Sequence, residues 1–151
     1  MAKPVCEVLV SESPLVLPGV EDLVETGALV DFYGIVRLTE GESEIAGIEY
    51  EAHHAMAEHQ LRSIAEEAGQ KFELQQIMIQ HRIGYVPVGV ASLLVRVGSR
   101  HRAAAFAAGQ WVVDELKRRA PIWKHPQAEV PERFSRRNDS NRVRETPVSP
   151  S

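Results

Sequence analysis

Apolar and polar residues alternate over several short stretches of the chain, a pattern typical of strands with two different faces. Strands are predicted over residues 5–10, 28–36, 44–52, 74–82, 90–98 and 122–130. The stretch 90–98 is apolar on both faces, which predicts a central position in its sheet. Residues 44–52 are predicted to return from 28–36 as a hairpin, with the polar residues 38–43 as a mobile loop.

Helices are predicted where apolar residues recur every three or four positions. Residues 54–68 form one such helix, ended by Gly69. A longer helix follows Ser99, its expected N-cap, and must end before Pro121, which lacks an N–H and disfavours helical geometry in the preceding residue. Its predicted buried stripe consists of Arg102, Phe106, Gly109, Val113 and Leu116. A short helix is also predicted over 18–25, where a proline and acidic residues occupy the first turn.

This order of elements predicts an α+β fold, a largely antiparallel sheet with packed helices. The chain has 151 residues, 44% of them apolar, which suits one domain with its own core and is short for two. We therefore expect a single domain over 1–134. Residues 135–151 are polar and rich in Pro and Ser, and we expect them to form a disordered tail.

Composition limits the classes of partner. Seventeen basic and 21 acidic residues give a net charge of −4, so no general attraction to nucleic acid or to an anionic membrane is expected, and anion binding has to be local. The single cysteine, Cys6, excludes an internal disulfide framework and suits a reducing cytosol. No apolar run approaches the ~20 residues of a membrane span, and the first residues lack a signal core. We expect a soluble, cytoplasmic protein.

Two lysines flank the corner at Pro121. Lys117 lies in the last turn of the long helix, and Lys124 follows in the next strand, beside Trp123. Ammonium groups fixed on both sides of a rigid corner would form a pocket for an anion. Lys117 is equally explained as a favourable cation at a helix C-terminus. Lys124 is less easily explained in this way, and a half-buried lysine can act as an acid, a base or a nucleophile.

A second cationic group opens the long helix. His101 and Arg102 lie beside the free N–H groups of its first turn, which is an anion-binding arrangement, although a helix cap and surface arginines explain these residues as well. Arg37 ends the strand 28–36 and has the same two explanations. His53 and His54 have no Cys, Asp or Glu cluster at metal spacing, so no metal is expected. The chain has no phosphate-binding or dinucleotide glycine motif and no nucleophile elbow.

Five stretches, taken together and in this order, resemble the MoaE family, the large, catalytic subunits of molybdopterin synthase. They are 27–37 (GALVDFYGIVR), 48–52 (IEYEA), 81–84 (HRIG), 98–102 (GSRHR) with Phe106, and Leu116-Lys117 followed by 121–124 (PIWK). The resemblance implies an α/β hammerhead-like fold with an additional small antiparallel β subdomain. It covers residues 27 to 124.

The resemblance also implies a reaction. Enzymes of this family convert cyclic pyranopterin monophosphate into molybdopterin by installing a dithiolene. The sulfur comes from the C-terminal Gly-Gly thiocarboxylate of a small, ubiquitin-like (MoaD-like) subunit. Family members form a homodimer of large subunits within a heterotetramer that carries two small subunits, and the synthase itself uses no metal or organic cofactor.

The family's functional residues fall on six positions of this chain. The two pocket lysines correspond to Lys117 and Lys124, the anion-binding residues to Arg37, His101 and Arg102, and Phe32 lies in the strand that lines the site. The phosphate-binding residues can be contributed across the dimer interface. One departure follows the second lysine, where this chain has His125-Pro126, so the family's acidic residue is missing there or displaced to Glu129.

Two other functions are compatible with the same residues. One is a noncatalytic protein that binds the ubiquitin-like subunit or a phosphate ligand on this scaffold, and retention of both lysines argues against it. The other is a plain phosphate or nucleotide binder that shares only the scaffold, and it would not require Lys117 and Lys124 together.

Overall fold

The computed structural model describes residues 4–20 and 23–134. The elements of its larger layer are β1 (Val5–Ser11), β2 (Ala28–Ile35), α1 (His54–Lys71), β6 (Gln76–Arg82), β8 (Ala91–Ser99) and α2 (Arg102–Arg119). The smaller elements are β3 (Thr39–Glu40), β4 (Ser43–Glu44), β5 (Gly47–Ala52), β7 (Gly84–Pro87) and β9 (Ile122–Gln127). The predicted α+β class is confirmed.

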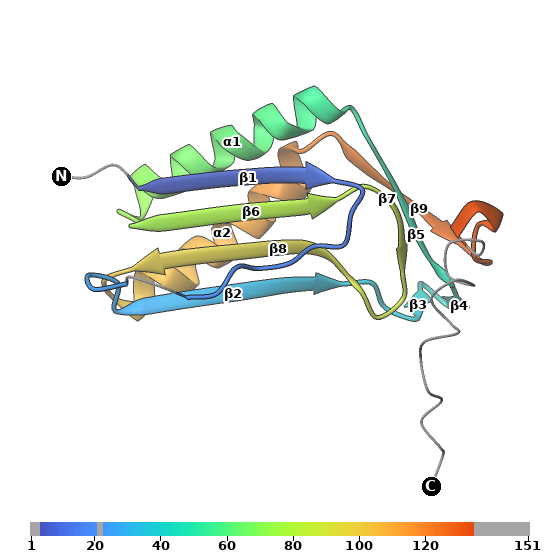
Figure 1. Cartoon of the computed structure of the whole chain (residues 1–151), viewed down its shortest axis with the longest axis horizontal. Helices are drawn as coiled ribbons and strands as arrows, with labels where there is room; N and C mark the ends of the chain where they lie inside the picture. Colours follow the sequence, from blue (N-terminus) through green and yellow to red (C-terminus); the bar gives the residue numbers. More distant parts are fainter. Residues whose placement is uncertain (1–3, 21–22, 135–151) are drawn as a thin grey trace, which may run out of the picture.

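The main sheet has four strands in the order β1-β6-β8-β2, and both helices cover one of its faces (Figure 1). Only β1 and β6 run parallel, and the other two pairs are antiparallel. The predicted central strand is confirmed, because β8 pairs on both sides. Completely buried aliphatic side chains of both helices and two strands form the core; they include Leu61, Ile64, Ile77, Ile79, Val97 and Val112.

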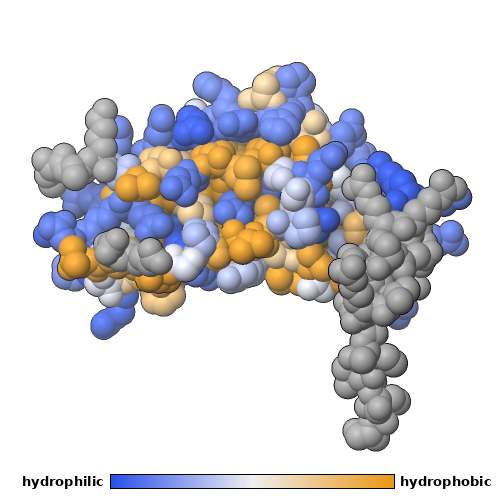
Figure 2. Space-filling view, viewed as in Figure 1, coloured by the Kyte–Doolittle hydropathy of each residue, from blue (hydrophilic) through white to orange (hydrophobic). Residues whose placement is uncertain are grey.

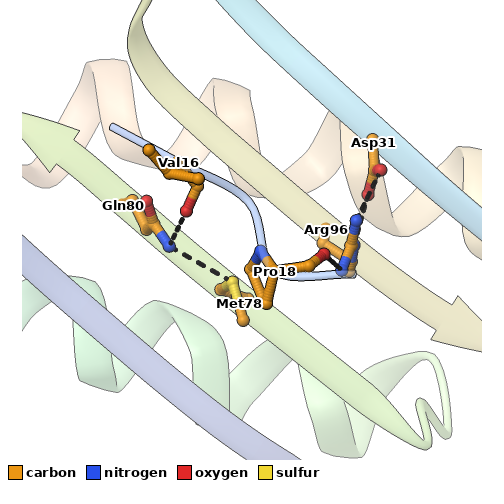
Figure 3. A network of polar contacts seen from close by, with 6 residues as sticks. All are labelled: Val16, Pro18, Asp31, Met78, Gln80 and Arg96. Atoms are coloured by element: carbon orange, nitrogen blue, oxygen red, sulfur yellow. Dashed lines mark hydrogen bonds and ion pairs between the residues drawn. The ribbon is translucent and has the colours of Figure 1, made fainter. Parts of the chain in front are cut away.

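The segment between β1 and β2 crosses the other face of this sheet (Figure 3). Gln80 donates to the carbonyl of Val16 at 3.3 Å, and Arg96 donates to the carbonyl of Pro18 at 2.7 Å. The helix predicted over 18–25 is wrong for 18–20 and 23–25, which are not helical, while 21–22 lie outside the described residues. The Pro18 carbonyl accepts a hydrogen bond from a side chain of the sheet instead of from a helical N–H group. Figure 2 shows apolar side chains gathered over the middle of this face.

A second sheet has the order β7-β5-β9 and crosses one end of the first (Figure 1). The hairpin predicted between 28–36 and 44–52 is wrong, because β2 pairs with β8 and β5 pairs with β7 and β9. The separate pairing has a packing reason, since Ile48 and Tyr50 of β5 form a small core of their own with neighbours that include Val36 and Val86. The strand β7 was not predicted, because it begins at one glycine with positive φ, Gly84, and is soon followed by another, Gly89.

Three details of the helices differ from the sequence-based expectations. Gly69 does not end α1 but is buried within it, packed so closely on Pro4 that an added Cβ would lie 2.8 Å from the proline Cγ. The N-cap of α2 is His101, while Ser99 ends β8 and its hydroxyl accepts the His101 N–H at 3.2 Å. Phe106 is 64% exposed, because the buried stripe of α2 is shifted to other residues: Ala105, Ala108, Gly109, Val112 and Leu116. The predicted tail, 135–151, lies outside the described residues.

Candidate active site

The corner between α2 and β9 has the predicted form. The helix ends at Arg119, its last turn is closed by a 3.0 Å hydrogen bond from the Ala120 N–H to the Leu116 carbonyl, and the chain continues past Pro121 into β9. Lys117 lies on the helix and Lys124 on the strand, and both are exposed. The two lysines are therefore separated by a backbone turn that proline and the helix end both fix.

Lys117 differs from the two arginines that follow it. Arg118 is paired with Glu115, and Arg119 is paired with Glu67 at 2.6 Å and with Glu115 at 3.5 Å. The hydrogen bond that Arg118 donates lowers the pKa of the Glu115 carboxyl, and the hydrogen bond that Arg119 donates to Glu67 raises the pKa of Arg119. Within residues 4–20 and 23–134, neither Lys117 nor Lys124 forms an ion pair. Both ammonium groups are thus available to an external anion.

Lys124 lies on the inner face of the small sheet. It is directly opposite Tyr50 in the β5–β9 register, and Tyr50 is only 6% exposed. Side chains of opposed residues in an antiparallel pair lie on the same face. Because β9 is an edge strand, the Lys124 side chain can share the face of the buried Tyr50 and still reach solvent.

The sequence His125-Pro126 does not interrupt this strand. Pro126 pairs with Ile48 and the register continues to Gln127. A proline is tolerated here because the free side of an edge strand needs no N–H donor. His125 points to the opposite face, where its Nε2 lies 2.8 Å from a carboxylate oxygen of Glu51. Its acidic partner therefore comes from β5 and not from Glu129.

A polar chain of side chains continues from Tyr50 into the main sheet. The Tyr50 hydroxyl donates to Ser92 Oγ at 3.0 Å, and Ser92 Oγ donates to the Gly34 carbonyl at 3.4 Å. Burial raises the pKa of the Tyr50 phenol, so the hydroxyl stays protonated and can donate. His81 lies edge-on to the Tyr50 ring, with 5.3 Å between ring centroids and an interplanar angle of 72°. Residues of β5, β6 and β8 thus meet at Tyr50, which is paired with Lys124 across the small sheet.

The other predicted site residues lie elsewhere on the chain. His101 and Arg102 are exposed at the start of α2, and Lys117 is 15 positions further along, which corresponds to about 22 Å of helix. Arg37 is exposed just beyond the opposite end of β2 from Ala28, the residue that pairs with Ser99. The chain therefore places Arg37 and the two lysines toward one end of the main sheet, and His101 and Arg102 at the other.

Phe32 lies between these two ends. It is 38% exposed and lines an apolar groove between β2 and α2. The remaining lining residues of the groove are Val30, Phe106, Gly109, Gln110, Val113 and Asp114. Phe106, expected in the core, is thus part of an accessible apolar surface.

Residues 10–119 match the family model described as MoaE protein. The chain belongs to the MoaE family. It is 41% identical over 98 residues to the molybdopterin synthase catalytic subunit of Bos taurus, a match that covers 65% of this chain and 52% of that protein. It is 37% identical over 100 residues to the catalytic subunit of Thermoplasma volcanium, covering 66% of this chain and 73% of that protein. The chain spans about half the length of the mammalian relatives that it matches.

Solved structures agree with this MoaE assignment. Molybdopterin synthase from Staphylococcus aureus superposes with a TM-score of 0.69 at 27% identity, covering 87% of this chain and 95% of that one. A complex of subunits 1 and 2 of molybdopterin-converting factor from Helicobacter pylori gives a TM-score of 0.58 at 25% identity, covering 68% of this chain and 66% of that one. The resemblance inferred from the five sequence stretches is therefore confirmed, as is the fold that it implied.

Sequence reasoning missed three residues of this MoaE chain that cluster around the Tyr50 side chain, opposite Lys124. Tyr50, His81 and Ser92 come from three strands, and no local spacing brings them together. The only available signal was weak: a tyrosine, a histidine and a serine in buried strands each require a polar partner.

Within the described residues, no group of three His, Cys, Asp or Glu side chains could hold a metal ion. The helices of that part of the chain are also too short or too polar to cross a membrane.

Proposed function

We propose that this chain is the catalytic subunit of a molybdopterin synthase. It transfers sulfur from the C-terminal thiocarboxylate of a small ubiquitin-like subunit to cyclic pyranopterin monophosphate, forming the dithiolene of molybdopterin. One observation carries the proposal: a MoaE-family chain presents two unpaired ammonium groups, Lys117 and Lys124, on either side of a fixed corner. Both the sulfur donor and the phosphate-bearing acceptor are anions, and each needs positive partners.

The two lysines receive different roles in this proposal. Lys117 orients the thiocarboxylate and assists proton transfer during attack on the pterin side chain. Lys124 stabilises the negative charge that develops nearby. An ammonium group suits both tasks, because it offers three donors on a flexible stem and a compact charge. The reaction as proposed draws on no metal or organic cofactor.

The phosphate is assigned to Arg37, His101 and Arg102, which requires two copies of the chain. About 22 Å of α2 separates Arg102 from Lys117, too far for both to contact one small substrate. A two-fold related copy, with its α2 running the opposite way, would bring its Arg102 to the Lys117 end of the first copy. The separation therefore supports a homodimer with two composite sites.

The contact between the copies is assigned to the β2 edge and the adjoining groove. Among the described strands, β2 pairs only with β8, so its outer edge is open. Beside this edge, Phe32 and Phe106 are exposed across the apolar groove. An exposed apolar surface next to an unpaired edge favours association with another protein surface.

The small subunit completes the proposed assembly as a heterotetramer, two catalytic and two ubiquitin-like chains. The Helicobacter pylori structure supports a two-subunit assembly, since it is a complex of subunits 1 and 2 of its molybdopterin-converting factor. A cytoplasmic location belongs to the same proposal, because a thiocarboxylate donor and the free thiol of Cys6 both suit a reducing compartment.

The deciding experiment combines the purified chain, a thiocarboxylated small subunit and cyclic pyranopterin monophosphate. Molybdopterin is detected as its oxidised, fluorescent derivative. Product formation is expected from the unaltered chain. No product in the presence of an active small subunit would overturn the proposal and leave the noncatalytic binding protein as the better description.

A matched pair of variants tests the role of Lys117. Lys117→Ala is expected to abolish turnover while partner binding, measured by calorimetry, stays within about twofold of the unaltered chain, since one exposed side chain is removed. Lys71→Ala is the control, because Lys71 is also exposed and also in the last turn of a helix. Equal loss of activity in both variants would contradict a specific role for Lys117.

A further inference from the structure

The buried wall beside Lys124 contains one titratable group with no assigned role, His81. It is 9% exposed at the end of β6 and lies edge-on to Tyr50, the residue directly opposite Lys124 in the β5–β9 register. The imidazole therefore lies next to the tyrosine that shares a face with Lys124. Burial lowers the pKa of His81, and the positive charge of Lys124 lowers it further, so the two groups interact electrostatically and the ring is neutral near pH 7.

The hydrogen bond at Nδ1 fixes which nitrogen carries the proton. Nδ1 lies 2.7 Å from the backbone carbonyl of Arg82. A carbonyl oxygen can only accept, so Nδ1 is the donor, and in a neutral imidazole Nε2 is then an acceptor without a proton. His81 consequently presents a hydrogen-bond acceptor at a buried position that the charge of the Lys124 ammonium reaches.

We propose that His81 is a positioning residue for Lys124: the Arg82 carbonyl orients the imidazole, Tyr50 holds it from the side, and Nε2 accepts a hydrogen bond from the Lys124 ammonium. This inference rests on the proposed function, since it gives Lys124 its fixed place in the sulfur transfer. Lysine has four rotatable bonds, and an anchored ammonium loses less entropy on meeting the developing charge. The other two ammonium donors remain available for the substrate.

Two near-isosteres of histidine separate this role from a purely structural one. In His81→Asn the amide nitrogen takes the place of Nδ1 and can still donate to the Arg82 carbonyl, but nothing replaces Nε2. In His81→Gln the amide oxygen takes the place of Nε2 and can accept from Lys124, whereas the bond to Arg82 is lost. A positioning role predicts that Asn is the worse substitute, and a structural role predicts that Gln is.

The first measurement is the steady-state kinetics of molybdopterin formation. His81→Asn is expected to lower kcat by about tenfold, the size expected for losing one hydrogen bond to a charged group, with little change in KM. His81→Gln is expected to recover most of that loss. Ile48→Val is the control for loosening of the small sheet, because Ile48 is on the same face of β5 but pairs with Pro126. A kcat for His81→Asn equal to that of the control would overturn the inference.

The second measurement is independent of catalysis. The rate at which an amine-acylating reagent modifies Lys124 is followed by mass spectrometry, with Lys117 as the internal reference. An anchored ammonium reacts slowly, so modification of Lys124 is expected to speed up several-fold in His81→Asn and to stay near the unaltered rate in His81→Gln. Equal rates in all three chains would overturn the positioning role, whereas absence of product from the unaltered chain would reject only the proposed function.

Discussion

Arg96 and Asp31 are joined by two parallel hydrogen bonds, from Nε to Oδ1 at 2.7 Å and from Nη2 to Oδ2 at 2.9 Å (Figure 3). The two residues are direct cross-strand partners in the β2–β8 register. The remaining terminal nitrogen of Arg96 donates to the Pro18 carbonyl at 2.7 Å. One guanidinium thus ties the edge strand β2, the central strand β8 and the segment that crosses the sheet.

Removing one partner of this ion pair should destabilise the fold more than replacing both partners by apolar residues. The Arg96 side chain is 6% exposed and the Asp31 side chain 28%, so Asp31→Leu leaves a nearly buried guanidinium without its counterion. We expect a loss of about 2–3 kcal/mol in the free energy of unfolding, below the figure for a completely dry pair. The double variant Asp31→Leu with Arg96→Met should lose less than Asp31→Leu alone. Urea denaturation of the two single variants and of the double variant measures these free energies of unfolding. Losses that add up in the double variant would contradict the prediction.

The fold was predictable wherever local pattern and tertiary environment agree. The run Leu93-Leu94-Val95 of the central strand β8 is apolar on both faces, which favours a covered middle strand, and Pro121 ends α2 by removing a donor. The predictions were wrong where contacts with residues distant in the sequence determine the local structure. Residues 18–20 are not helical because Arg96, 78 positions from Pro18, takes the carbonyl that a helix would have used. Likewise β5 pairs with β7 and β9 because a separate small core exists.

The candidate site was predictable in its charges and not in its surroundings. Lys117 and Lys124 could be named because a proline corner between two lysines is a local feature. Tyr50, His81 and Ser92 could not, because their meeting depends on how the second sheet crosses the first where β6 ends and β8 begins. Phe106 was assigned to the core from its helical spacing, whereas the structure exposes it beside Phe32.

Acid should destabilise the chain partly through His81. Burial lowers the pKa of His81 below its ordinary value of 6.5, so the unfolded chain binds this proton more tightly than the folded chain does. The stabilising contribution is therefore complete above pH 6.5 and is lost as the pH falls through that value toward the folded pKa. Urea denaturation between about pH 5 and pH 7 should show a decline that His81→Gln reduces.

The control for this titration is His59→Gln, since His59 is exposed on α1. Acidic residues contribute to the pH dependence of all three chains alike, so only the difference between variants is informative. The His59 variant should retain the full decline. An identical decline in the His81 variant would contradict the burial argument.

Mixing inactive variants tests whether the proposed site is built from two copies. In a dimer of Lys117→Ala with Arg102→Ala, one site receives Lys117 from the second chain and Arg102 from the first, and is intact, while the other site lacks both. Equal co-expression should therefore restore about one quarter of the sites. Lys117→Ala with Lys124→Ala should restore none, because both lysines belong to the same chain's half of each site. Molybdopterin formation by the two mixtures is the measurement, and a first mixture as inactive as the second would place all the catalytic groups within one chain.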